Sequence, residues 1–387
     1  MSRKPIDDLT GFDVGPDFER FSQRDDIFCR ALWDESVKSR RSKEFFGGYF
    51  MPRARSRRSE GFSQRDYALR NASWHVTNVL RDSHRQETGR KEGFFDYFTA
   101  HEAGWPEPYA FDSPEQATRD LEKVARFAGA DLFGVCAGDE RWMYRELFDD
   151  RMGTGKPAEV PGDLPHVIVI GESMDLDLTR TVPSALSGSA TGMGYSNDSV
   201  TLLTLAQYIR NLGYRAYASM NDTALAVPLA VQAGLGEAGR HSLLITREFG
   251  PRLRLGKVFT DLPLVNSRPQ QFGVNRFCDI CDRCVTACPP KAIAAGAPSN
   301  HRHNRSNLKG VSKWTTNAET CFKFWVNQNS DCSICIRVCP YNRDYRRWAN
   351  RLWRWLAGTR LRRLALWLDD RLVDRRRQKA SWWWDRP

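Results

Sequence analysis

Eight of the ten cysteines fall into two runs whose spacing suits iron–sulfur chemistry. The first run begins at Cys278 with the spacing C-x2-C-x2-C-x3-C-P, and the second begins at Cys332 with C-x2-C-x3-C-P and follows Cys321. In such runs the last cysteine typically ligates the other cluster of a pair. The spacing therefore predicts two [4Fe–4S] clusters with crossed ligands, Cys278, Cys281, Cys284 and Cys339 on one and Cys321, Cys332, Cys335 and Cys288 on the other.

Zinc and disulfide bonds are the alternative uses of these cysteines. Zinc sites rarely contain a C-x2-C-x2-C-x3-C-P run, and disulfide frameworks are typical of short secreted domains, not of 387 residues. Cys29 and Cys136 have no partner at ligand spacing, so we expect them to be small buried side chains. The seven histidines form no metal-ligand pattern, and we expect His301 and His303 in an exposed loop between the clusters.

The composition is that of an ordinary soluble globular protein, with 41% hydrophobic and 27% charged residues. The chain before the first cysteine run is long enough for a further domain with its own core. No secretory signal begins the sequence, and no stretch approaches the roughly 18 apolar residues that span a bilayer. We therefore expect a cytoplasmic protein.

The formal net charge of +11 is concentrated in the C-terminal tail. A basic surface of this kind favours an acidic partner, such as a low-potential ferredoxin or flavodoxin that donates electrons. An anionic membrane surface contacted by the tail and nucleic acid are the other classes of partner, and a merely solvated basic face is the alternative.

Helical and strand-like patterns alternate in the middle of the chain, which indicates an α/β or α+β core. Helices are expected from Ser113, over 199–212 and over 224–232, and two short amphipathic helices follow residue 346 with a break at Gly358. The expected strands are 131–136, 167–170, 215–219 and 242–246. The domains predicted are an irregular N-terminal wrapping arm (1–110), a catalytic core (111–271), the double-cluster module (272–345) and a basic, Trp-rich tail (346–387).

Several short segments, in the expected order and at the right mutual distances, resemble the reductive dehalogenases. The resemblance extends from about Phe18 to the C-terminus. The segments are Gly194–Asn197 (GYSN), Ser219–Thr223 (SMNDT), Ala233–Glu237 (AGLGE), Thr246–Leu264 (TREFGPRLRLGKVFTDLPL), Cys321–Trp325 (CFKFW) and Trp382–Trp384 (WWW).

The resemblance implies an enzyme that removes halide from an organohalide with a Co(I) corrinoid. It also implies an α+β fold, in which a corrinoid-binding, nitroreductase-like α/β core is fused to a ferredoxin-like double-cluster module. The sequence has no Asp-x-His-x-x-Gly signature, which agrees with a cobalamin held base-off without a protein ligand to cobalt. No Tat signal and no fused reductase module are apparent, which favours a catabolic enzyme that receives electrons from a separate donor.

Site residues follow from the same resemblance. Tyr195 matches the family's proton donor, Arg254 the cation that strengthens the phenol as an acid, and Asn221 a residue that orients donor or substrate. Trp325 and Leu255 match walls of the substrate pocket, for which core packing is the alternative. The residues implied around the corrinoid are Met220, Thr223, Ala224, Gly234, Gly236, Glu237, Arg240, His241, Ser242 and Leu243.

Two rival functions remain open from the sequence. An epoxyqueuosine reductase also combines a corrinoid with two clusters and acts on tRNA, which the basic charge would suit. That family uses an aspartate as proton donor and has no cysteine as far upstream as Cys321, so we do not expect nucleic acid as the partner. A non-catalytic electron carrier would need neither the Tyr195 motif nor a corrinoid.

Overall fold

The computed structural model describes residues 3–49, 59–88, 105–157 and 163–386. A four-stranded antiparallel sheet lies at the centre, in the order β2 (Leu132–Ala137), β5 (His166–Ser173), β9 (Leu253–Thr260) and β6 (Ala216–Ser219). The predicted strands at 131–136, 167–170 and 215–219 are confirmed. Strand β9 was not predicted, because Arg254 and Lys257 interrupt its apolar pattern.

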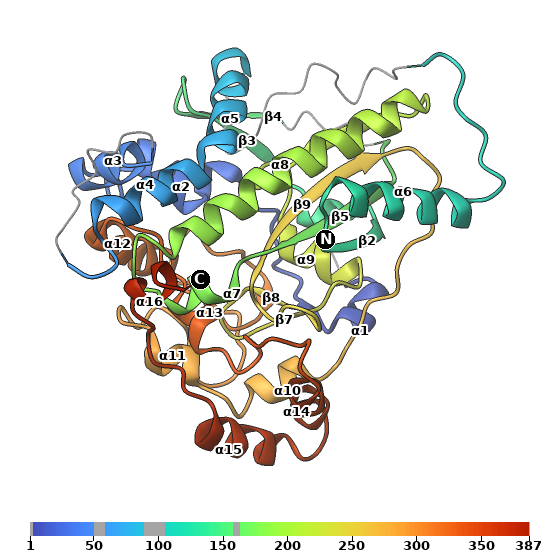
Figure 1. Cartoon of the computed structure of the whole chain (residues 1–387). Helices are drawn as coiled ribbons and strands as arrows, with labels where there is room; N and C mark the ends of the chain where they lie inside the picture. The colour runs from blue at the N-terminus through green and yellow to red at the C-terminus, as the bar shows by residue number, and fades with distance from the viewer. Residues whose placement is uncertain (1–2, 50–58, 89–104, 158–162, 387) are drawn as a thin grey trace.

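The sheet has helices on both faces, as its alternating side chains require. Ile168 and Ile170 of β5 pack against α6 (Pro114–Ala128) and α8 (Gly188–Asn211). Val167 and Val169 point to the other face and pack with α9 (Ala226–Gln232). Figure 1 shows the long helix α8 lying over the sheet beside α6. The core is therefore a mixed helix and sheet structure of three layers.

Helix α8 begins eleven residues before the predicted start at 199, at Gly188. Its first turns are rich in glycine and serine, which have low helix propensity and form no apolar stripe. The small residues serve close packing on β9. A Cβ atom at Gly194 would lie 2.7 Å from Arg254 Cγ, and one at Gly256 would lie 2.5 Å from Asp198 Oδ1. The segment around Tyr195 is thus helical and lies directly on the sheet.

Three small antiparallel pairs complete the strands. They are β1 (Asp13–Val14) with β10 (Val311–Ser312), β3 (Glu146–Asp149) with β4 (Thr154–Pro157), and β7 (Glu237–Ala238) with β8 (Leu244–Ile245). The strand predicted at 242–246 is thus reduced to the two residues of β8. The β1–β10 pair joins the N-terminal segment to the region between the cysteine runs.

The prediction of an irregular N-terminal arm is wrong in its secondary structure. The described part contains α1 (Ile6–Thr10), η1 (Gln23–Asp25), α2 (Ile27–Trp33), α3 (Arg40–Gly47), α4 (Gln64–Ser73) and α5 (His75–Thr88). These helices are specified by local end signals more than by long apolar stripes. Ser39 and Ser63, for example, form capping boxes at the starts of α3 and α4.

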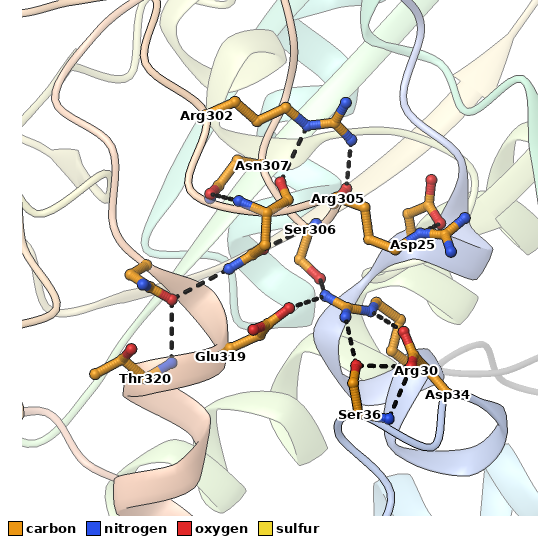
Figure 2. A network of polar contacts seen from close by, with 12 residues as sticks. Asp25, Arg30, Asp34, Ser36, Arg302, Arg305, Ser306, Asn307, Glu319 and Thr320 are labelled. Atoms are coloured by element: carbon orange, nitrogen blue, oxygen red, sulfur yellow. Dashed lines mark hydrogen bonds and ion pairs between the residues drawn. The ribbon is translucent and has the colours of Figure 1, made fainter.

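A polar network binds the arm to the cysteine-rich region (Figure 2). The buried Arg30 of α2 forms ion pairs with Asp34 at 2.9 Å and with Glu319 at 2.7 Å, and it donates to Ser306 Oγ at 2.9 Å. Arg305 pairs with Asp25 at 2.7 Å. Glu319 lies in the first turn of α12 (Ala318–Gln328), the helix that carries Cys321 and Trp325. The network therefore fixes the position of α12 relative to the arm.

Three of the eight clustered cysteines lie in short helices, and two longer helices follow the second cysteine run. The remaining helices are η2 (Glu140–Trp142), α7 (Leu176–Arg180), α10 (Val274–Cys278), α11 (Arg283–Ala287), α13 (Ile334–Val338), α14 (Trp348–Gly358), α15 (Arg362–Leu372) and α16 (Ala380–Trp384). The predicted pair of tail helices with a break near Gly358 is confirmed. Among the described residues, no helix combines the length and apolar character needed to cross a membrane.

The close contact of α8 with β9 predicts a steric effect of substitution. We expect Gly256→Ala to lower the free energy of unfolding by about 1–3 kcal/mol, because its methyl group would collide with Asp198 and Leu202. Gly47→Ala is the matched control, since nothing lies within 4 Å of a Cβ atom there. Anaerobic urea unfolding followed by tryptophan fluorescence measures both. A Gly256→Ala midpoint equal to that of the wild type would contradict the packing argument.

Candidate functional site

The oxygen of Tyr195 accepts two hydrogen bonds from the residues with which the sequence grouped it. Asn221 Nδ2 donates to it at 2.8 Å, and Arg254 Nη1 donates at 3.2 Å. The three side chains come from α8, from the loop after β6 and from β9. Because both partners are donors, the phenolic hydrogen remains available for donation to a third group. The structure thus brings the predicted trio together, while its catalytic role stays a prediction.

Aromatic side chains from the N-terminal arm cover this trio. The Trp74 ring lies 4.9 Å from the Tyr195 ring, and the Tyr49 ring lies 5.2 Å from Trp74. Gly192 on α8 makes room for the indole, since a Cβ atom there would lie 2.4 Å from Trp74 Cδ1. Sequence reasoning missed Trp74 and Tyr49. The only signal for them was the aromatic richness of the arm.

A cavity of about 900 Å³ adjoins the trio. Arg254, Trp325, Met174 and Thr191 are among the residues that line it. Tyr195 is not part of the lining, but it accepts a hydrogen bond from Arg254, which is. The volume is at the upper end of ordinary small-molecule pockets, so the cavity suits a bulky ligand. Leu255 does not line the cavity. It follows Arg254 on β9 and packs in the hydrophobic cluster with α9 on the other face of the sheet.

Three of the ten residues implied around the corrinoid line this cavity, namely His241, Ser242 and Leu243. Others shape the surrounding loops. Glu237 accepts the backbone N–H of Val274 at 3.2 Å, and a Cβ atom at Gly236 would lie 2.2 Å from the carbonyl oxygen of Ile245. Met220, Thr223, Ala224 and Gly234 are likewise loop residues outside the lining. The segment 225–228, which was not predicted, lines the cavity instead.

His241 presents a buried donor without a partner among the described residues. Its Nδ1 accepts the N–H of Leu243 at 3.3 Å, and its Nε2 is buried and unpaired. Burial lowers the pKa of His241 to about 4, so the ring is neutral at pH 7 and carries its proton on Nε2. His241 lines both the large cavity and the small one beside the first quartet, and an unpaired buried N–H at such a place fits a bound polar group.

The eight clustered cysteines separate into the two predicted quartets. Cys278, Cys281, Cys284 and Cys339 line one small cavity, and Cys288, Cys321, Cys332 and Cys335 line the large one. All ten cysteines are free of disulfide bonds. Burial raises the pKa of Cys321 to about 11 and that of Cys332 to about 12, so an iron cluster would have to compensate the buried thiolates.

No group of three or more potential ligands is arranged around a single metal ion in the described part of the chain. Ligation by the two quartets stays a prediction. Cys29 and Cys136 are buried, and His301 and His303 are exposed, as expected.

Arg240 lies beside the first cysteine quartet and not in the large cavity, although the resemblance grouped it with the corrinoid contacts. Its guanidinium donates to the carbonyl oxygen of Cys278 through Nη2 at 2.6 Å and to that of Gly296 through Nη1 at 2.8 Å. Its positive charge lowers the pKa of Cys278 and Cys284 against the larger, opposing effect of burial. A buried cation at this place favours negative charge on the quartet.

Three ionisable side chains are buried between α8 and the sheet, below Tyr195. Burial lowers the pKa of Lys257 to about 7, and its ammonium donates to the carbonyl oxygen of Met220. Burial also raises the pKa of Glu172 to about 7, and Glu172 accepts Thr201 Oγ1 at 3.0 Å. Asp198 is fully buried, and its pKa is raised by burial and by Glu172. Sequence reasoning missed this group because its members lie on three different elements.

A central sheet under one long helix, a cavity lined by four of the cysteines and a second quartet beside it define an iron–sulfur protein with room for a further bulky ligand. Family models agree with this description. Residues 148–264 match "Reductive dehalogenase subunit", and residues 277–342 match "4Fe-4S double cluster binding domain". The chain therefore carries the reductive dehalogenase family domain followed by a double-cluster domain.

Individual proteins give the same result. A tetrachloroethene reductive dehalogenase of Desulfitobacterium hafniense is 37% identical over 273 residues, which cover 61% of this chain and 50% of the relative. The enzyme of the same name from Sulfurospirillum multivorans is 33% identical over 299 residues, covering 70% and 60%. A solved reductive dehalogenase described as suggesting a mechanism for B12-dependent dehalogenation shares the fold, with a TM-score of 0.75, 21% identity and coverage of 97% and 50%. The chain spans about half the length of the curated relatives it matches.

The buried Glu172 predicts a pH dependence of stability. Its pKa is about 7 in the folded protein against an ordinary value of 4.5, so the folded state keeps a proton that the unfolded chain releases. Stability from this carboxyl therefore falls as the pH rises from about 4.5 to 7. We expect Glu172→Gln to gain about 1–3 kcal/mol relative to the wild type over that interval.

Urea unfolding at several pH values measures this difference. Because Glu172 also raises the pKa of the neighbouring Asp198, the difference reports Glu172 together with its coupling to that carboxyl. The exposed Glu248 provides a control, and Glu248→Gln should follow the wild type throughout. Parallel stability curves for Glu172→Gln and the wild type would rule out a raised pKa at Glu172.

Proposed function

We propose that this chain is a reductive dehalogenase that replaces a carbon-bound halogen by hydrogen. The reaction consumes two electrons and one proton and releases one halide ion. The observation that carries the proposal is the Tyr195 oxygen, which accepts Asn221 and Arg254 beside a large cavity that four cysteines also line. A proton source and an electron route thus meet at one ligand site. The matches to reductive dehalogenases support this assignment.

A base-off corrinoid, as in cobalamin, fits the large cavity by size and by the unpaired N–H of His241. When bound, it would supply a Co(I) centre able to cleave carbon–halogen bonds. His241, Ser242, Leu243 and the segment 225–228 would hold it. The close packing around Gly239 leaves no space for a side chain there, since a Cβ atom would lie 2.7 Å from Ile245 Cδ1. A nitroreductase-like description of this core remains a prediction.

The proton would come from Tyr195. Once the phenol gives up its proton, the oxygen carries a negative charge to which Asn221 and Arg254 already donate hydrogen bonds. Preorganised donors of this kind stabilise the developing charge without reorganisation. Trp74 packs on the ring and Trp325 lines the cavity, so aromatic surfaces would exclude water and receive an apolar organohalide.

The electrons would pass singly through the two cysteine quartets. Cys335 of the quartet at the large cavity lies close enough to Cys284 of the other quartet for Cys284 to raise the pKa of Cys335. Because the quartet with Cys321 lines the large cavity, its cluster would be the inner one, next to the corrinoid, and the cluster of the quartet with Cys278 would be the outer one. A separate low-potential donor, such as a ferredoxin or flavodoxin, would supply the electrons, in keeping with a cytoplasmic, catabolic role.

Replacement of the proton donor gives the first test of this function. We expect Tyr195→Phe to keep its cobalt and iron but to lose halide release on the order of 100-fold or more, because the general acid is gone. Tyr208→Phe, a half-buried tyrosine on the same helix, is the control and should retain activity. The assay uses anaerobically purified, cobalamin-reconstituted protein, a low-potential reductant and a panel of aryl and alkyl halides.

The same preparation separates the rival functions. About one cobalt and eight irons per chain with halide release are expected for two [4Fe–4S] clusters and one corrinoid. Iron without cobalt would contradict the proposal in favour of an electron carrier. Both metals without halide release would leave the reduction of an epoxyqueuosine tRNA as the function to assay. Full turnover by Tyr195→Phe would reject the proton-donor role alone.

The buried Arg240 predicts an effect on the outer cluster. A reduced cluster carries one more negative charge, which the nearby guanidinium stabilises, so we expect Arg240→Gln to lower the reduction potential by on the order of 50 mV. Arg276→Gln is the control, because Arg276 is exposed although it lies two residues from Cys278. A redox titration followed by electron paramagnetic resonance measures the shift. An unchanged potential in Arg240→Gln would exclude electrostatic tuning by this residue.

A further inference from the structure

Helices α14 and α15 present an apolar outer surface that no other part of the described chain covers. Trp348, Trp355 and Trp367 are 70%, 63% and 52% exposed. Four exposed leucines accompany them, namely Leu352, Leu361, Leu364 and Leu372. The opposite faces of the same helices bury Trp353 and Ala365 in the core around the first cysteine quartet. The two helices lie together at one end of the molecule, away from the sheet (Figure 1).

The same surface is strongly basic. Between residues 346 and 372 the sequence has eight arginines and two aspartates. Both aspartates are neutralised by arginines outside these helices, since Asp369 is buried and pairs with Arg343 and Arg375, and Asp370 pairs with Arg283. In the described part of the chain no acidic side chain forms an ion pair with four exposed arginines beside or between these tryptophans, which are Arg347, Arg351, Arg360 and Arg363.

Two other tryptophans of the tail have a structural role, because their indole groups form hydrogen bonds within the protein. The Trp353 indole N–H donates to the carbonyl oxygen of Ala365 at 2.8 Å, and that of Trp384 donates to Asp66 at 2.9 Å. Trp348, Trp355 and Trp367 are instead largely in solvent, although burial would favour each of them. Core packing thus accounts for part of the tail's tryptophan content but not for these three.

We propose that this Trp–Arg surface of α14 and α15 docks on an anionic lipid bilayer. Tryptophan and leucine beside arginine are the side chains that hold an amphipathic helix in the headgroup region, and each arginine near an anionic surface adds about 1 kcal/mol. A bilayer surface needs no pocket to receive these side chains, and neither cavity described above is lined by α14 or α15. The proposal concerns the surface alone and does not depend on the dehalogenase function.

Co-sedimentation of the whole protein with vesicles tests the docking. Vesicles of phosphatidylglycerol and phosphatidylcholine should bind the protein at low salt, vesicles of phosphatidylcholine alone should bind it weakly, and high salt should release it. Brominated lipids in the anionic vesicles should quench part of the tryptophan fluorescence. Absence of binding to anionic vesicles at low salt would overturn the proposal.

Two sets of substitutions locate the contact. The combination Trp348→Ala, Trp355→Ala and Trp367→Ala should lower the partition coefficient on the order of tenfold or more and remove the quenching. Arg347→Gln with Arg351→Gln and Arg363→Gln should weaken binding to anionic vesicles only. Trp105→Ala with Phe127→Ala is the matched control, because these exposed side chains lie far from the tail in sequence. Unchanged iron–sulfur absorbance verifies folding of each variant.

Three further outcomes would each overturn lipid docking. Vesicle binding that survives the tryptophan and arginine substitutions would place the contact elsewhere. A dimer in size-exclusion chromatography that the tryptophan substitutions abolish would assign the surface to a second copy of the chain. Tighter binding of an acidic ferredoxin than of vesicles, lost in the same variants, would assign it to an electron donor.

Discussion

The closeness of helix α8 to strand β9 is the constraint on which the candidate site depends. Gly194 on the helix and Gly256 on the strand leave no room for a side chain at the contact. Because the backbones approach so closely, Tyr195 of the helix lies within hydrogen-bond distance of Arg254 on the strand. The antiparallel pairing of β9 with β6 then brings the loop that carries Asn221 to the same place. The contact between α8 and β9 thus determines the relative positions of Tyr195, Arg254 and Asn221.

Tyr195 lies between two different buried environments, one with ionisable side chains and one with aromatic side chains. Below Tyr195, the buried Glu172, Asp198 and Lys257 place ionisable groups in a region that apolar packing would stabilise better. Above it, the N-terminal arm contributes Trp74 and Tyr49, and the buried Arg30 links that arm to the helix of Cys321 (Figure 2). The site therefore joins three parts of the chain that are far apart in sequence.

The sequence allowed the cysteine quartets and the Tyr195, Asn221 and Arg254 group to be predicted, because spacing and short motifs are local signals. It did not predict β9 or the first turns of α8, since charged residues interrupt the strand pattern and small residues give a helix no apolar stripe. Trp74 was missed because the space for its ring is made by the absence of a side chain at Gly192, which gives no signal in the sequence. Leu255 was assigned to the pocket by its neighbour Arg254, yet strand alternation turns it to the opposite face. Tertiary contacts decide all these cases.

The exchange of Cys288 and Cys339 between the two quartets has a consequence for how the protein matures. Neither quartet is contained in one continuous stretch of chain, because the first needs Cys339 and the second combines Cys288 with Cys321. With these ligand sets, a ribosome-bound chain that ends before Cys339 could complete only the inner set, and the outer cluster would wait for the last cysteine to emerge. Insertion of iron and sulfide into the outer set would then follow the synthesis of both runs. Loss of Cys288 from the first run, or of Cys339 from the second, would leave incomplete the set that is built mainly from the other run.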